Sequence, residues 1–126
     1  MGHMMLRRSV FPALGVLFSL LLSAGFAETL HAAEPHLAGS CDVRKSMGYC
    51  MEYRGTDWTS RDAKDDCSTA PDGTFGDSPC PSKKRVGICS YLTRGTEESR
   101  ILYIYYEPME VSAANMSCPG TFTPMK

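Results

Sequence analysis

Six cysteines constrain this chain more than any other feature of its sequence. An even number of cysteines in a short exported chain is typical of a disulfide framework, whereas zinc sites need closely spaced cysteine pairs or histidines. The 126-residue sequence has no C-x2-C pair, and no histidine follows His36. We therefore expect no metal site and no cofactor. The cysteines expected to form three disulfide bonds are Cys41, Cys50, Cys67, Cys80, Cys89 and Cys118.

The N-terminal residues have the pattern of an export signal. Two arginines, Arg7 and Arg8, precede an apolar run, and small residues follow it up to Ala27. This pattern predicts a signal peptide over residues 1–27 and a secreted, periplasmic or cell-surface protein. An uncleaved membrane anchor is the alternative, but the apolar run is shorter than the ~20 residues of a usual membrane span.

Two segments follow the predicted signal peptide. Residues 28–40 lack a strong periodicity and contain proline and glycine, so we interpret them as a flexible leader. Residues 41–126 form a single disulfide-stapled domain. The sequence "LAGSC" before Cys41 is similar to a lipobox, but its leucine is one position too far from the cysteine. We therefore expect no lipid anchor at Cys41.

Several short sequence motifs of the domain occur twice. "CDVRKSMGYC" and "CPSKKRVGIC" both read C-x6-G-x-C, and each is followed by an alanine four residues before a cysteine and by a Gly-Thr-Phe. These matches predict an internal duplication, with pseudo-repeats over residues 41–79 and 80–126. A chance match is the alternative, because cysteine-rich chains easily produce coincident spacings. Since each half holds three cysteines, at least one disulfide must join the halves.

The residue pattern predicts a small disulfide-rich α+β fold of antiparallel β-hairpins and short helices. Residues 85–93 and 100–108 are rich in β-branched and aromatic residues and are separated by a polar turn, which is typical of a hairpin. A short helix is expected over residues 111–118, with Ser112 as its N-cap, and another over residues 59–67, with Thr59 as its N-cap.

Helices this short are not stable alone, so a disulfide from each helix end to the sheet is expected. We favour bonds between strands and helices, with Cys89–Cys118 as the first choice. The phenylalanines of the two Gly-Thr-Phe returns, Phe75 and Phe122, are expected to cover the small core.

We align the predicted hairpin with Leu92 opposite Ile101. Alternate residues of a strand point to opposite faces, and in this register the face with Cys89 forms the core. The other face is also apolar, so either the first half of the domain covers it or it binds a partner. The candidate partner-binding residues on this second face are Ile88, Ile101, Tyr103 and Tyr105.

Three features of the domain extend over most of residues 41–122: a G-x-C-x-x-Y strand, a turn that begins with Cys80-Pro81, and a tyrosine-rich strand before a terminal cysteine. In these features the chain resembles small six-cysteine secreted proteins predicted in Gram-negative bacterial genomes. The resemblance implies export and a disulfide scaffold. It implies no particular activity and no functional residue.

Composition narrows the expected function. Removal of Arg7 and Arg8 with the signal peptide leaves 11 basic and 14 acidic residues, a net charge near −3, so we do not expect nucleic-acid binding. No histidine follows His36, and the thiols are expected to be oxidised, so the domain has neither the general base nor the free thiol that nucleophilic catalysis usually needs. We therefore expect that the protein is not an enzyme. The chain is expected to be an exported binding or interaction module of the envelope or extracellular space. The alternative is a structural subunit that self-associates through its tyrosine-rich strand.

Overall fold

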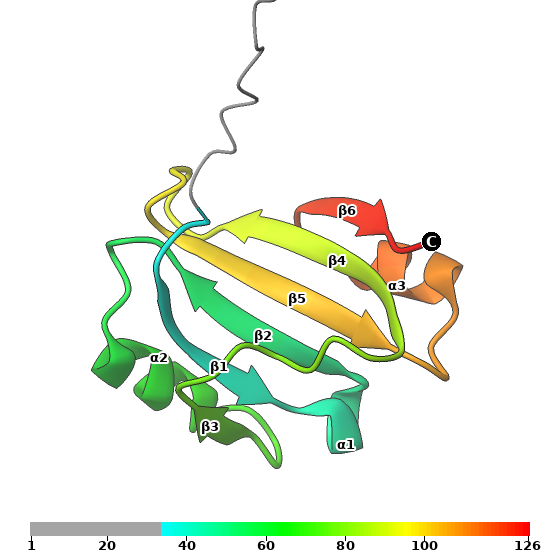
Figure 1. Cartoon of the computed structure of the whole chain (residues 1–126), viewed down its shortest axis with the longest axis horizontal. Helices are drawn as coiled ribbons and strands as arrows, with labels where there is room; N and C mark the ends of the chain where they lie inside the picture. The colour runs from blue at the N-terminus through cyan, green and yellow to red at the C-terminus, as the bar shows by residue number, and fades with distance from the viewer. Residues whose placement is uncertain (1–33) are drawn as a thin grey trace, which may run out of the picture. The chain divides into compact units, whose positions relative to one another are not determined.

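The computed structural model describes residues 34–126, which form a six-stranded antiparallel sheet with three short helices (Figure 1). The predicted signal peptide and residues 28–33 of the predicted leader lie outside the described residues. The elements, in chain order, are β1 (Leu37–Asp42), α1 (Arg44–Met47), β2 (Tyr49–Arg54), α2 (Ser60–Cys67), β3 (Thr74–Gly76), β4 (Arg85–Leu92), β5 (Arg100–Tyr106), α3 (Val111–Ser117) and β6 (Thr121–Pro124).

The strand order is β3-β1-β2-β5-β4-β6, so the sheet is built in the same way from either edge. A short edge strand that follows a helix pairs with a longer strand, and this longer strand pairs with one of the two central strands. Figure 1 shows α2 beside β1 and β3, and α3 beside β4 and β6. The α+β architecture predicted from the sequence is therefore correct in outline, and the sheet is its larger part.

One face of the sheet carries both longer helices, and we call it the helix face. Cys41, Met51, Tyr103 and Cys89 are direct neighbours across β1, β2, β5 and β4, so their side chains share this face. Cys41 is bonded to Cys67 at the end of α2, and Cys89 is bonded to Cys118 just after α3. Each disulfide thus pins one helix, and buried alanines, Ala63 and Ala114, let the helices approach closely.

The opposite face is crossed by the chain that runs from β3 to β4, and we call it the loop face (Figure 1). Cys80 in this crossing is bonded to Cys50 of β2, and its backbone N–H donates to the buried Glu52 carboxylate at 2.8 Å. The Tyr106 hydroxyl donates to the Pro81 carbonyl at 2.6 Å. The crossing is therefore attached to both central strands.

The three predicted disulfides are confirmed, and so is the specific pair Cys89–Cys118. Cys50–Cys80 is the bond that joins the two predicted halves. Such a framework fits an oxidising environment outside the cytosol. The sulfur of Cys41 is buried and bonded to Cys67, so it is not a free thiol that could carry a lipid. Among residues 34–126, no helix is long and apolar enough to cross a membrane.

The Gly-x-Cys units that have equivalent positions in the sheet are not the two that end the C-x6-G-x-C segments. Gly39-Ser40-Cys41 lies in β1 and Gly87-Ile88-Cys89 lies in β4, and in both strands the register shifts just before the glycine. A Cβ atom on Gly39 would come within 2.5 Å of the Phe75 ring, and one on Gly87 within 2.3 Å of the Phe122 ring. Only glycine leaves room for these rings, which pack partly buried over the sheet as expected.

Two predictions therefore need correction. Residues 37–40, expected in the flexible leader, belong to β1. The two C-x6-G-x-C segments do not have equivalent positions in the sheet, because Cys50 lies on β2 opposite Ile104. The β1 sequence has few β-branched residues. It forms a strand because β2 and β3 provide hydrogen-bond partners on its two sides.

The predicted hairpin exists, but its predicted register is wrong by one residue. Leu92 lies opposite Arg100, and Tyr91 lies opposite Ile101. A slip of one residue moves a whole strand face to the other side. Tyr103 and Tyr105 therefore lie on the same face as Cys89, and the separate second face predicted for them does not exist.

The two helices are close to their predicted ranges. Thr59 caps α2 as expected, since its side chain accepts the Asp62 backbone N–H at 3.1 Å. The predicted cap of α3 is wrong. Ser112 lies inside that helix, and the N-cap position belongs to Glu110, whose side chain makes no capping bond.

Candidate functional site

The helix face has an open cavity of about 400 Å³ beside α3, which we call the tyrosine cleft. It lies where the ends of the two central strands meet the helix. Its lining residues come from α1, β2, β5, the last residue of α3 and the segments that flank this helix. They are Met47, Tyr49, Tyr103, Tyr105, Met109, Ser117 and Pro119.

Three tyrosine rings form the floor of the cleft, and strand pairing positions them. Tyr49 of β2 lies directly opposite Tyr105 of β5, and Tyr103 lies one strand repeat away on the same face. The Tyr49 ring meets the Tyr103 ring at 5.6 Å and the Tyr105 ring at 5.9 Å between centroids, both edge-on. Such edge-to-face contacts hold the rings in fixed orientations.

The walls of the cleft are adaptable. Met109 follows β5, and a Cβ atom on Gly48 would lie 3.0 Å from its terminal methyl group, so the glycine leaves this side chain room. Met47 is exposed, and its sulfur accepts a hydrogen bond from the Tyr49 hydroxyl at 3.3 Å. Methionine side chains repack easily around a ligand. A rigid aromatic floor is thus combined with flexible walls.

The cleft is electrically neutral. None of its seven lining residues is charged. Burial raises the pKa of Tyr103 to about 12 and also raises the pKa values of Tyr49 and Tyr105, so all three phenols stay protonated near neutral pH. These phenols can donate hydrogen bonds, but they are poor general bases. Residues 34–126 contain no group of three His, Cys, Asp or Glu side chains placed to hold a metal ion.

The structure separates the four residues that the sequence indicated for partner binding. Tyr103 and Tyr105 lie together in the cleft, although Tyr105 is only 2% exposed. Ile101 is buried on the same face near Tyr53. Ile88 lies on the loop face and packs against the cluster that includes Ile104 and Tyr106.

The sequence interpretation missed Met47, Tyr49 and Met109. Tyr49 comes from the first half of the chain, and only the pairing of β2 with β5 brings it to the cleft. One local feature of the sequence indicates Tyr49, which is that it directly precedes Cys50 in a predicted strand. It has no meaning until the pairing of the central strands is known.

The corresponding region beside α2 is closed. The Tyr53 hydroxyl donates to the Asp66 carboxylate at 2.7 Å, and the Trp58 ring packs on the Tyr53 ring with centroids 4.8 Å apart. Tyr53 is fully buried, which together with this hydrogen bond raises its pKa. Tyr53 is thus covered at one end of the helix face, whereas Tyr49 and Tyr103 line an open cleft at the other end.

No protein-family model matches the chain, and neither a curated protein nor a solved structure is significantly similar to it.

Proposed function

We propose that the chain is an exported, non-catalytic, disulfide-stabilised binding module, and that its tyrosine cleft receives an apolar side chain of a protein partner. The observation that carries this proposal is the open cleft with its neutral aromatic floor. In the other half of the domain, the corresponding tyrosine, Tyr53, is covered by Asp66 and Trp58. An aromatic floor with no charge favours an apolar anchor over an ionic ligand. The three disulfides support a location in the envelope or outside the cell.

The residues around the cleft support a protein as the ligand. Among the described residues, the exposed large hydrophobic side chains include Met47 at the rim and Val111 and Met116 on α3. Met116 is 87% exposed. Tyrosine and methionine are enriched in the centres of protein interfaces. None of these exposed side chains belongs to α2.

The same proposal includes the internal duplication. The strand order, the two glycine–phenylalanine contacts and the two strand-to-helix disulfides all support it. A duplicated scaffold explains why one half can lose its sealing contacts and still fold, because the disulfides and the sheet are retained.

A self-associating structural subunit has weaker support. The tyrosine-rich strand β5 lies between β2 and β4, so its backbone is paired on both sides and offers no free edge to another copy. The cleft is the place where a second copy could contact Tyr103 of this strand. Size-exclusion chromatography of the exported protein therefore belongs to the test, and a stable oligomer would make a second copy the occupant.

The test uses peptides selected from a random displayed library against the oxidised, exported protein. Ser117→Arg puts a long charged side chain at the exposed wall of the cleft, and Ser60→Arg makes the same change on α2 as a control. We expect selected peptides with apolar or aromatic anchors whose binding is weakened about tenfold or more by Ser117→Arg alone, since loss of a buried anchor commonly costs more than 1.4 kcal/mol.

The proposal fails if no peptide is enriched and the protein is monomeric. It also fails if both arginine variants bind the selected peptides equally well. Thermal unfolding of both variants shows whether a loss of binding comes from a loss of folding.

A further inference from the structure

A second cavity, of about 600 Å³, lies on the loop-face side of the sheet, away from the tyrosine cleft. We call it the basic pocket. It is lined by Arg44 and by Lys83 and Lys84, which lie about 40 residues further along the chain. The predicted mature chain as a whole is acidic. The lining residues used in the argument are Arg44, Pro81, Lys83, Lys84, Tyr106 and Glu107.

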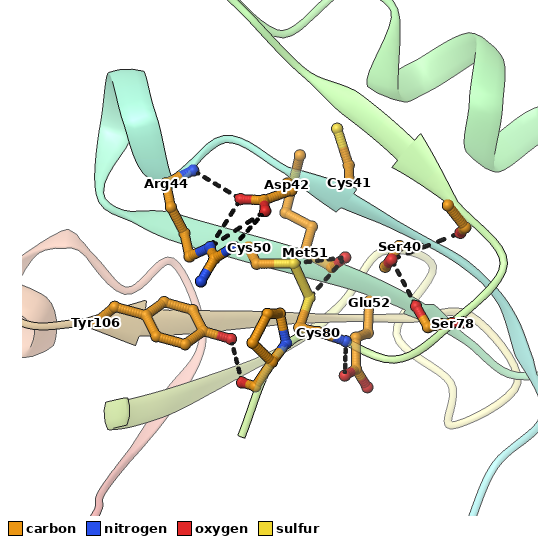
Figure 2. The surroundings of a disulfide bond; sticks show 12 residues. Ser40, Cys41, Asp42, Arg44, Cys50, Met51, Glu52, Ser78, Cys80 and Tyr106 are labelled. Atoms are coloured by element: carbon orange, nitrogen blue, oxygen red, sulfur yellow. Dashed lines mark hydrogen bonds and ion pairs between the residues drawn. A yellow bond between two sulfur atoms is a disulfide. The ribbon is translucent and has the colours of Figure 1, made fainter. Parts of the chain in front are cut away.

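Arg44 is held in place before any ligand arrives. Its guanidinium makes a two-pronged contact with the Asp42 carboxylate, with Nη2 to Oδ2 at 2.7 Å and Nε to Oδ1 at 3.0 Å. The guanidinium carbon also lies 5.2 Å from the centre of the Tyr106 ring (Figure 2). These contacts leave Nη1 without a hydrogen-bond partner among residues 34–126, so this nitrogen can donate to a bound anion.

The two lysines stand on a loop that is fixed at several points. The Cys50–Cys80 disulfide anchors its start, and the Tyr106 hydroxyl donates to the Pro81 carbonyl (Figure 2). The Arg85 side chain donates to the same carbonyl. The Lys84 carbonyl accepts the Glu107 backbone N–H at 2.9 Å. The pocket is therefore preorganised, which lowers the entropy cost of binding.

Lys84 has a backbone conformation that lysine rarely adopts. Its φ angle is 63°, in the left-handed region that favours glycine. The other described non-glycine residue with positive φ is Asp72, and aspartate adopts this region more readily. A lysine at this place costs stability that a glycine would not. We take this as a sign that the side chain has a use.

We propose that the basic pocket binds a phosphate group, with Arg44, Lys83 and Lys84 as its ligands. A phosphate has three acceptor oxygens and nearly two negative charges, so three cations can share it better than they can share a carboxylate. Tyr106 and Pro81 supply an apolar wall for the organic part of the ligand. Asp42 behind Arg44 and Glu107 at the rim reduce the positive charge, and this favours a small ligand over nucleic acid.

Calorimetric titration of the exported, oxidised protein with inorganic pyrophosphate tests the site. The double variant Lys83→Ser with Lys84→Gly should bind about tenfold more weakly or worse, because it removes two charge-assisted contacts. Lys84→Gly alone should unfold at the same or a higher temperature, because it relieves the backbone. Glu107→Gln should bind more tightly than the unaltered protein, since it removes the one acidic side chain of the lining.

A matched control removes the same charge from α2. Arg61→Ser with Lys64→Ser changes two exposed cations there and should leave binding within about twofold of the unaltered protein, as expected for distant surface charges in salt. A second arm uses vesicles of phosphatidylglycerol, with phosphatidylcholine vesicles as the reference. Binding to the anionic vesicles alone, lost in the Lys83/Lys84 variant, identifies the phosphate as a lipid headgroup.

Two results overturn the proposal. One is the absence of binding to both pyrophosphate and anionic vesicles. The other is an equal loss of binding in the two double variants, which would mean that overall charge and not this pocket attracts the anion. Neither result bears on the tyrosine cleft, because the two sites share no lining residue.

Discussion

The α2 half and the α3 half of the domain share a framework and differ in what they cover. In each half a disulfide joins a strand to the end of a helix, over 26 residues in the first and 29 in the second. Beside α2, a carboxylate and an indole seal the central tyrosine. Beside α3, the corresponding space is open. The framework alone therefore does not decide whether a cavity forms.

Part of this difference arises at one equivalent position of the two helices. The residue before the helix-end cysteine is Asp66 in the first half and Ser117 in the second. Asp66 reaches Tyr53, whereas the Ser117 hydroxyl donates to the Ala113 carbonyl of its own helix at 2.9 Å. A short side chain that turns back to its helix leaves Tyr49 and Tyr103 partly exposed, while Tyr105 stays buried. Small changes on a disulfide-bonded scaffold can thus open a cavity without changing the fold.

Removal of either strand-to-helix disulfide should have the largest effect. Loops of 26 and 29 residues predict losses of about 3.5 kcal/mol for each bond in the chain-entropy account. Cys41→Ser with Cys67→Ser and Cys89→Ser with Cys118→Ser should therefore lower the free energy of unfolding almost equally. Urea denaturation of the two variants measures this. Losses that differ by more than about 1.5 kcal/mol would show that the halves are not equivalent scaffolds.

The tyrosine hydroxyls should separate the halves. Tyr53→Phe removes a hydrogen bond to a carboxylate and should cost about 1.5 kcal/mol, since bonds to charged groups lie near or above that value. Tyr105→Phe should change the free energy of unfolding by less than about 0.5 kcal/mol, because its hydroxyl has no partner among residues 34–126. Equal losses in urea denaturation would mean that the α3 half is sealed as well.

Helix capping should give the smallest difference. Thr59→Ala removes the cap of α2 and should cost about 1 kcal/mol, whereas Ser112→Ala should cost less than about 0.5 kcal/mol because Ser112 caps nothing. Glu110→Asn supplies a capping side chain to α3 and should stabilise the domain by up to about 1 kcal/mol. Thermal unfolding of the three variants is the measurement. A larger loss for Ser112→Ala than for Thr59→Ala would contradict the observed N-termini.

The sequence predicted what depends on local patterns. The strands of the β4–β5 hairpin, the Thr59 cap and the Cys89–Cys118 bond all follow from residues near one another or from the need to anchor a short helix. The hairpin register could not be fixed in this way. Both faces of β5 are apolar, so a pairing shifted by one residue satisfies the hydrophobic pattern equally well.

Both candidate sites depend on long-range pairing that no local pattern reveals. Tyr49 reaches the tyrosine cleft only because β2 pairs with β5. Arg44 lines the same cavity as Lys83 and Lys84 because the crossing from β3 to β4 is bonded to β2 through Cys50. The residues next to the lysines in the sequence do not indicate this cavity, because Arg44 lies in the other half of the chain.

The order of the disulfides has a consequence for how the protein matures. In a chain that is exported N-terminus first, Cys41 and Cys50 would reach an oxidising compartment before Cys67 or Cys80. The native bonds of Cys41 and Cys50 cross in the sequence, as Cys41–Cys67 and Cys50–Cys80, whereas Cys89–Cys118 joins two successive cysteines. An oxidant that couples thiols in order of arrival makes the wrong bond first, and only thiolate exchange corrects it. For an exported chain, this order predicts that the bonds of Cys41 and Cys50 need disulfide isomerisation, whereas Cys89–Cys118 can form correctly in one step.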